Sequence, residues 1–254
     1  MESRASFQSV VVLAGSSDIA RAITKKLCIA GTHTVVLAGR NPLLLDQAAQ
    51  EAQEYGATST DTVIFDAEEP SFAAEIVTEA FEKSDGPVDL VVVAVGTVGD
   101  QETDENDAVA SARMITVNET WPVAALAEVR RRLVAQGHGR ILVLSTAAAV
   151  RVRRVSYLYS GAKAGLDRLC VGLAESLEGT GVQLQLLRPA AVRTRMSLGL
   201  APTPFTTGAN EVADNALRGL STNRLVIWSP PILRYLFVLV RIMPPALWRR
   251  LANR

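Results

Sequence analysis

The chain has 254 residues, of which 48% are hydrophobic and 20% charged, so it can bury a sizeable core and is not a disordered tail. Its 26 basic and 26 acidic residues cancel, which excludes the strong basic excess of a nucleic-acid-binding chain. The balance hides an asymmetry, because residues 215–254 contain seven arginines and no carboxylate, which leaves a formal charge of −7 on the first 214 residues.

Runs rich in Val, Ile and Leu recur along the chain, as in strands that helices cover on both faces. Stretches with helical apolar spacing separate them. This alternation predicts an α/β fold, a doubly wound parallel sheet of about seven strands in three α/β/α layers. The predicted strands are 10–14, 34–38, 62–65, 90–95, 141–145, 182–187 and 225–228. The predicted helices are 18–30, 43–55, 71–83, 106–136 and 157–178, and Pro, Thr and Gly predict a loop at 197–210, where a lid could sit.

The first turn between a strand and a helix is made of small residues. Gly15 is followed by Ser16, Ser17, Asp18 and Ile19. Such a turn directs backbone N–H groups and a helix N-terminus toward a phosphate. A plain turn in which Ser16 or Ser17 caps the helix is the alternative.

Charged residues follow the next two predicted strands. Arg40 stands where enzymes that bind a ribose 2′-hydroxyl need a carboxylate, and an arginine there suits a 2′-phosphate. A surface arginine in a loop is the alternative. Asp66 offers a carboxylate to an adenine amino group, or serves as a helix-start acid ahead of Pro70.

Tyr159 and Lys163 give the strongest local signal in a chain that has only four tyrosines and four lysines. Residues four apart share one face of a helix, and a cation beside a phenol lowers a pKa that is otherwise near ~10. Thr146 ends the fifth strand thirteen residues earlier, where its hydroxyl binds a substrate oxygen or merely the backbone. Asn118 is a polar amide within a predicted helix, where asparagine is a poor helix former.

Together with Gly96 and residues 188–194, these features resemble the short-chain dehydrogenase/reductase family over nearly the whole chain. The resemblance implies a Rossmann-type fold and hydride transfer between NADPH, with NADH as the alternative, and a carbonyl or alcohol carbon. It makes Tyr159 the general acid/base, while Lys163 lowers its pKa and holds the ribose. Thr146 stands where the family usually has serine, and Asn118 supports a proton-relay water.

The same resemblance implies which residues bind the cofactor. They are Gly15, Ser16, Ser17, Asp18, Ile19, Arg40, Asp66, Gly96, Tyr159, Lys163, Pro189, Val192 and Thr194. The first turn departs from the family pattern Thr-Gly-x-x-x-Gly-x-Gly, because Leu13, Ala14, Asp18 and Ala20 occupy its four named positions. Gly15 is expected to supply the flexibility one place later.

A narrower resemblance is to the decaprenylphosphoryl-2-keto-ribose reductases, which reduce a keto sugar on a lipid phosphate during arabinan precursor synthesis in the cell wall. It rests on Arg151, Arg153 and Arg154 before Tyr159, on residues 192–196 and on the arginine-studded apolar tail. It implies an anionic, lipid-linked keto substrate whose phosphate these three arginines bind. A solvated loop or a salt-bridged oligomer contact is the alternative.

Residues 225–254 add a strand and an apolar, arginine-rich helical tail to the NAD(P)-binding catalytic body of residues 1–224, within the same domain. The tail lies in a membrane interface, or it packs as a buried helix in a dimer or lid. An ordinary alcohol dehydrogenase of unrelated substrate and a non-catalytic cofactor-binding partner subunit are the rival functions.

Few features of the sequence bear on cellular location and on partners. The only cysteines, Cys28 and Cys170, are far apart, and the only histidines are His33 and His138, so we expect a reducing compartment and no metal. No export signal and no run of about eighteen uncharged apolar residues is present. We expect a cytoplasmic homo-oligomer with peripheral contact at the inner face of the plasma membrane and no nucleic-acid partner. A partner oxidase is left open.

Overall fold

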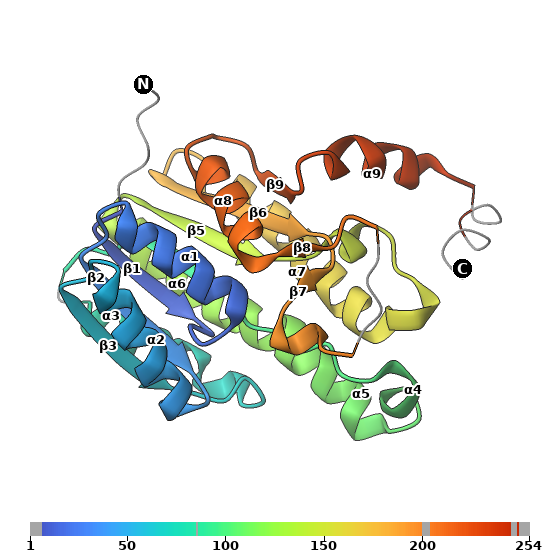
Figure 1. The fold of residues 1–254 in the computed structure, drawn as a ribbon, viewed down its shortest axis with the longest axis horizontal. Helices are drawn as coiled ribbons and strands as arrows, with labels where there is room; N and C mark the ends of the chain where they lie inside the picture. The colour runs from blue at the N-terminus through green and yellow to red at the C-terminus, as the bar shows by residue number, and fades with distance from the viewer. Residues whose placement is uncertain (1–6, 85, 200–203, 245–247, 249–254) are drawn as a thin grey trace.

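Seven strands form the central sheet of the computed structural model, which describes residues 7–84, 86–199, 204–244 and 248 (Figure 1). All neighbouring strands pair in parallel, in the order β3-β2-β1-β4-β5-β6-β9. The predicted doubly wound sheet is therefore confirmed. Its strands are β1 (Ser9–Leu13), β2 (Thr34–Gly39), β3 (Ser59–Ile64), β4 (Leu90–Val93), β5 (Gly139–Leu144), β6 (Val182–Pro189) and β9 (Val226–Ser229).

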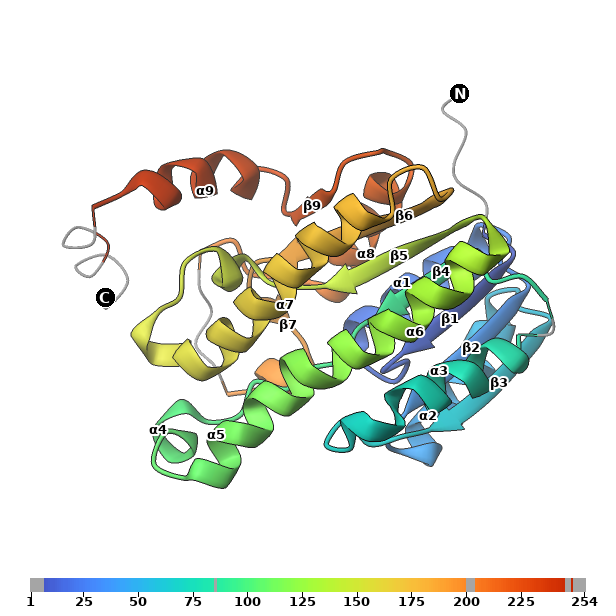
Figure 2. The same ribbon diagram turned by 180° about the vertical axis from the view of Figure 1, so that it is seen from behind.

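Helices cover both faces of the sheet, as its unalternating apolar strands require (Figures 1 and 2). On one face lie α1 (Asp18–Ile29), α2 (Pro42–Glu54) and α8 (Ala209–Leu220). On the other lie α3 (Ala73–Glu82), α6 (Trp121–Gln136) and α7 (Tyr157–Ser176). Successive residues of one strand enter opposite cores, with Val10 and Val12 in one and Val11 and Leu13 in the other. This burial fixes the sheet between two layers.

The long helix predicted at 106–136 is interrupted. It consists of α5 (Ala108–Ile115), a π-helical turn at Thr116–Thr120 and then α6. Pro122 stands in the first turn of α6, where it has no N–H to donate to the preceding π-helical turn. The π-helical turn adds a residue per turn, and it contains Asn118, which is fully buried. The interruption therefore sits at a candidate site residue.

The sequence failed to predict α8. Its buried residues Val212, Ala213, Ala216 and Leu220 face α1 and β9, and the helix provides the crossover that two parallel strands need between β6 and β9. Within the predicted loop at 197–210, β8 (Thr207–Gly208) pairs with β7 (Val192–Arg193), and residues 200–203 lie outside the described residues. The shorter elements are α4 (Gln101–Asp104), η1 (Pro70–Phe72), η3 (Ala147–Val150), η4 (Arg154–Ser156) and η5 (Arg195–Ser197).

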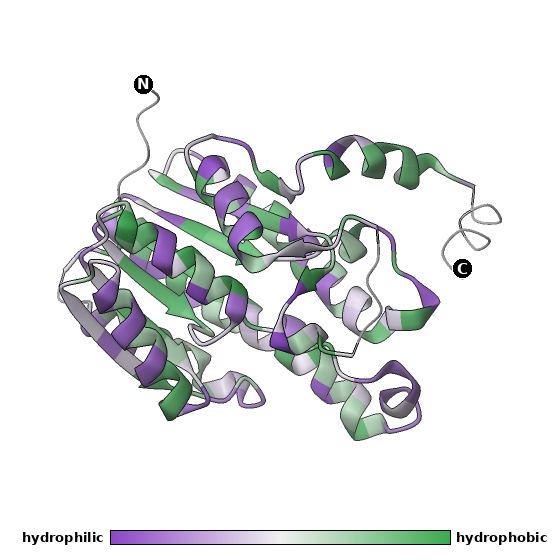
Figure 3. Ribbon diagram, viewed as in Figure 1, coloured by the Kyte–Doolittle hydropathy of each residue, from purple (hydrophilic) through white to green (hydrophobic). Residues whose placement is uncertain are grey.

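The tail forms helix α9 (Leu233–Ile242), which extends beyond the end of the sheet and is apolar along most of its length (Figures 1 and 3). Leu233 and Val240 are buried against the body, and the ring of Phe237 stacks on Trp228 of β9 with centroids 5.2 Å apart. One face of α9 is thus packed. Within the described part of the chain, no helix is both long and apolar enough to cross a bilayer.

In the turn after β1, the left-handed backbone conformation occurs at Ala14 and not at Gly15. Ala14 has a φ of 67°, in the left-handed region, whereas a Cβ on Gly15 would stand 2.8 Å from Cδ2 of Leu37 and 2.9 Å from its Cβ. The expectation that Gly15 supplies the flexibility is therefore wrong. Gly15 is needed because β2 packs against it, and Ala14 takes the conformation that favours glycine.

We predict that Ala14→Gly raises the free energy of unfolding by about 1 kcal/mol, because the substitution relieves the left-handed strain of an L-residue. Denaturant unfolding monitored by circular dichroism measures the change. Ala112→Gly, at an exposed position inside α5, is the matched control and should lower stability by about 1 kcal/mol. Equal destabilisation by both variants would contradict the strain at Ala14.

Candidate active site

The carboxyl ends of the parallel strands meet at one edge of the sheet, and most predicted site residues lie there. Gly15 follows β1, Arg40 follows β2 and Gly96 follows β4. Thr146 follows β5, and Pro189 ends β6. Residues from five segments far apart in the sequence are thereby gathered at one edge.

Lys163 lies on α7 and is only 4% exposed. Its Nζ donates to the carbonyl oxygens of Val95 at 2.9 Å and Leu144 at 3.2 Å, which joins the ends of β4 and β5. Desolvation lowers the pKa of Lys163 to about 8, with a smaller opposing effect of Cys170. An ammonium has three donors, so one N–H remains for another acceptor.

Asn118 is held against the segment that follows β4. Its Oδ1 accepts from the backbone N–H of Thr97 at 3.1 Å, and its Nδ2 donates to the carbonyl of Thr97 at 2.9 Å. A Cβ on Gly96 would stand 2.8 Å from Oδ1 of Asn118 and 3.0 Å from Nζ of Lys163. The structure therefore brings Gly96, Asn118 and Lys163 together, and only glycine fits between the two side chains.

Tyr159 lies one turn before Lys163 on α7, and its hydroxyl shares a hydrogen bond with the side chain of Thr146. Burial raises the pKa of Tyr159 to about 12, and the hydrogen bond with Thr146 offsets only part of this effect. The expected lowering of this pKa by Lys163 is therefore wrong, because desolvation dominates. The phenol is protonated at neutral pH, which suits a proton donor.

A buried ion pair supports these residues and was not predicted. Arg188 donates from Nε and Nη2 to the carboxylate of Asp167 at 2.8 and 2.5 Å, and Ser145 donates to the same carboxylate at 2.6 Å. The Trp228 ring lies 5.2 Å from the guanidinium. The sequence shows Asp167 only as one polar residue of a helix, so nothing local marks its partners.

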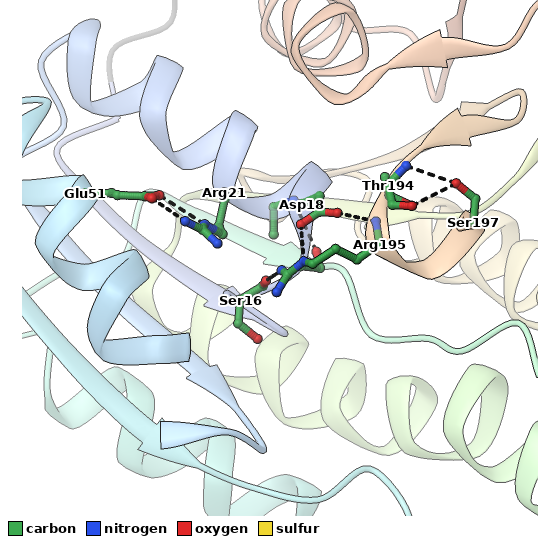
Figure 4. Close-up of polar contacts among 9 residues, drawn as sticks. Ser16, Asp18, Arg21, Glu51, Thr194, Arg195 and Ser197 are labelled. Carbon is green, nitrogen blue, oxygen red and sulfur yellow. Dashed lines mark hydrogen bonds and ion pairs between the residues drawn. The ribbon is translucent and has the colours of Figure 1, made fainter. Parts of the chain in front are cut away.

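The first turn is tied to the segment after β6, as Figure 4 shows. Ser17 caps α1 by accepting from the N–H of Ala20 at 3.2 Å, which is the capping role that the plain-turn alternative gives it. The carboxylate of Asp18 accepts from the backbone N–H and Nε of Arg195 at 2.6 and 2.7 Å. Nη2 of Arg195 donates to the carbonyl of Ser16 at 2.6 Å. Sequence reasoning missed Arg195.

The remaining candidate cofactor residues lie around this turn. Arg40 is exposed, and no carboxylate within the described ranges pairs with it. Asp66 is exposed too, and its Oδ1 accepts from the N–H of Glu68 at 3.0 Å, so it also caps a turn. Ile19 packs partly into the core. Val192 belongs to β7, and Thr194 precedes η5.

The three arginines between Thr146 and Tyr159 have different surroundings. Arg151 donates from Nη1 to the carbonyl oxygens of Val240 at 2.5 Å and Met243 at 2.7 Å, at the end of α9, and its guanidinium lies 4.9 Å from the Trp248 ring centroid. Arg151 thus already has two acceptors. Arg153 is half-buried and Arg154 exposed, so these two carry the prediction of an anion-binding rim.

Four similarities connect this chain to known proteins. A family model described as short chain dehydrogenase matches residues 8–203. The chain is 35% identical to an uncharacterized oxidoreductase of Mycobacterium tuberculosis, over 95% of this chain and 96% of that protein. It is 37% identical to another from Streptomyces coelicolor, over 96% of both. A short-chain dehydrogenase from Sphingobium yanoikuyae in complex with NADPH has the same fold, with a TM-score of 0.79 at 23% identity over 94% of this chain and 97% of that one.

Proposed function

Because the chain belongs to the short-chain dehydrogenase/reductase family, we propose that it reduces a carbonyl group with NADPH, with NADH as the alternative cofactor. Members of this family are oxidoreductases. The observation that carries the proposal is the gathering of Tyr159, Thr146, Lys163 and Asn118 at the carboxyl edge of the sheet. A non-catalytic binding subunit has no need for this set. The NADPH complex of the Sphingobium protein supports the choice of cofactor.

The residues at the edge of the sheet fit a dinucleotide. Gly15 lets β2 pack closely against the first turn, and Gly96 lets Asn118 and Lys163 approach the end of β4. Helix α1 presents its N-terminus beside Ser16. The exposed guanidinium of Arg40 suits a 2′-phosphate, and the carboxylate of Asp66 suits an adenine amino group. Pro189, Val192 and Thr194 would face the nicotinamide. Bound NADPH would supply the hydride.

In this proposal, side chains of the site donate the proton to the substrate and restore it to the donor. Tyr159 stays protonated at neutral pH and donates its proton to the carbonyl oxygen as negative charge develops there. The hydroxyl of Thr146, bonded to the phenol, orients the same oxygen. Lys163 is fixed by two strand carbonyls and offers its third N–H to a ribose hydroxyl. Asn118 supports a water that returns a proton to Tyr159.

The substrate class that we propose is a keto group on an anionic, lipid-linked sugar, as in cell-wall arabinan precursors. Arg153 and Arg154 precede Tyr159 and provide positive charge beside the reacting carbon. Helix α9 contributes an apolar surface on the same molecule, held to this loop by Arg151. An alcohol dehydrogenase with an unrelated substrate is the alternative, and a panel of ketones with and without a polyprenyl phosphate distinguishes the two.

We propose that the outward face of α9 binds an anionic membrane surface. Val238, Leu239 and Ile242 on this face are 59%, 60% and 76% exposed. The last forty residues contain seven arginines and no carboxylate, and a basic, apolar helix lies in the interface of anionic lipid. The charge therefore favours a membrane over an acid-paired protein contact.

Tyr159→Phe should lower turnover about 100-fold or more, because it removes the proton donor, and should leave the dissociation constant for NADPH nearly unchanged. NADPH oxidation with a carbonyl from the ketone panel measures turnover. Tyr157→Phe is the matched control, since this exposed phenol lies two residues before Tyr159 on α7, and it should leave turnover unaltered. Full turnover in Tyr159→Phe would overturn the assignment.

Arg40→Ala should weaken NADPH binding by about 1.5–3 kcal/mol, the contribution of a charge-assisted hydrogen bond, and should leave NADH binding almost unchanged. Fluorescence titration of the same variant with both cofactors provides its own control, because the two differ only in the 2′-phosphate. A wild-type chain that prefers NADH would show that Arg40 does not contact the cofactor.

The wild-type chain should co-sediment with vesicles that contain phosphatidylserine at low salt, with each surface arginine contributing about 1 kcal/mol, and high salt should release part of it. Replacing Val238, Leu239 and Ile242 with serine should release most of the remainder. These three side chains are exposed, so the variant should keep its cooperative melt. Val109→Ser, at an apolar residue on α5 that is 76% exposed, is the control. Failure to sediment, with loss of a dimer in the triple variant, would instead assign α9 to self-association.

A further inference from the structure

Asp18 is the most unusual residue of the first turn. It stands where the family pattern has its second glycine, in the first turn of α1 and beside the point where a dinucleotide would place its phosphates. A carboxylate there adds negative charge next to negative charge. The chain needs a compensating cation if it is to bind NADPH at this turn.

Arg195 supplies that cation from the opposite side of the site. Its backbone N–H and Nε bind the two oxygens of Asp18, 177 residues away, and its Nη2 binds the carbonyl of Ser16, 179 residues away (Figure 4). The side chain of Asp18 is 23% exposed and that of Arg195 is 47% exposed. The pair is therefore formed at the surface of the turn, where a bound cofactor has access to it.

The guanidinium of Arg195 keeps free donors. It has five N–H groups, of which these contacts use one on Nε and one on Nη2, and its Nη1 has no acceptor among the described residues. A planar guanidinium that is held by a carboxylate at Nε and by a carbonyl at Nη2 presents its remaining N–H groups in a defined direction. That arrangement is suited to a phosphate oxygen.

We propose that Arg195 is a cofactor-binding residue, whose guanidinium neutralises Asp18 and donates its remaining N–H groups to the phosphates that bridge the two halves of NADPH. The Asp18–Arg195 pair thereby replaces the missing glycine and fastens residues 192–197 over the bound cofactor. This inference rests on the proposed function. It adds a residue from the segment after β6 to the phosphate site of the first turn.

A double-mutant cycle on the full chain tests the inference by NADPH fluorescence titration at low salt. Arg195→Ala should weaken binding about tenfold or more, because it removes the phosphate donor and leaves Asp18 uncompensated. Asp18→Asn keeps an acceptor for the backbone N–H of Arg195 but removes the charge, so it should bind NADPH at least as tightly as the wild type. The double variant should recover only part of the loss seen in Arg195→Ala, because it removes the uncompensated charge of Asp18 and still lacks the phosphate donor.

Arg193→Ala is the matched control, because it removes one exposed positive charge from the same segment, and its binding should stay within about twofold of the wild type. Hydrogen exchange at residues 192–197 gives a second measurement, and NADPH should slow it in the wild type and not in Arg195→Ala.

Unchanged NADPH binding in Arg195→Ala would overturn the inference and leave the proposed function intact. Equal weakening in both single variants and in the double variant would also overturn the inference. In that case the Asp18–Arg195 pair would only hold the two segments together and would not contact the cofactor. A wild-type chain that binds neither NADPH nor NADH would overturn the proposed function itself.

Discussion

The ion pair between Asp167 and Arg188 is the contact on which the geometry of the site depends. Asp167 lies one turn after Lys163 on α7, Arg188 belongs to β6, and Ser145 follows β5 and binds the same carboxylate. Leaving a buried carboxylate unpaired costs about 3–5 kcal/mol, so these three elements do not shift independently. Tyr159 and Lys163 are thereby held at a fixed place relative to Thr146 on one side and Pro189 on the other.

The elements that sequence predicts well are those with a local cause. Strands buried on both faces have continuous apolar runs, and all seven were predicted within a few residues. The largest error in a strand is at β3, which begins at Ser59 instead of residue 62, because an edge strand exposes Ser59 and Asp61 and so resembles a loop. Helix α8 was missed because its buried face consists mainly of small residues, including Ala213 and Ala216, between polar ones.

Within the site, the sequence revealed Tyr159 and Lys163 because four residues on one helix fix their relative positions. It did not reveal the partners of Asp18, which is 177 residues from Arg195, because only the closed sheet brings the first turn and the segment after β6 together. The direction of the pKa shift at Tyr159 also requires the fold. Sequence shows a lysine nearby, whereas the desolvation that raises the pKa depends on what surrounds the phenol.

Arg151 connects helix α9 to the loop that leads into Tyr159. Arg151 lies in the loop between Thr146 and Tyr159, and it binds two carbonyls at the end of α9, where the helix dipole is negative. The inner face of α9 is packed through Leu233, Phe237 and Val240, so the helix transmits its position to that loop as a unit. A surface that immobilises the outer face of α9 therefore also restricts the loop that leads into Tyr159. Arg151 would therefore couple the proposed docking of α9 to the order of the loop before Tyr159.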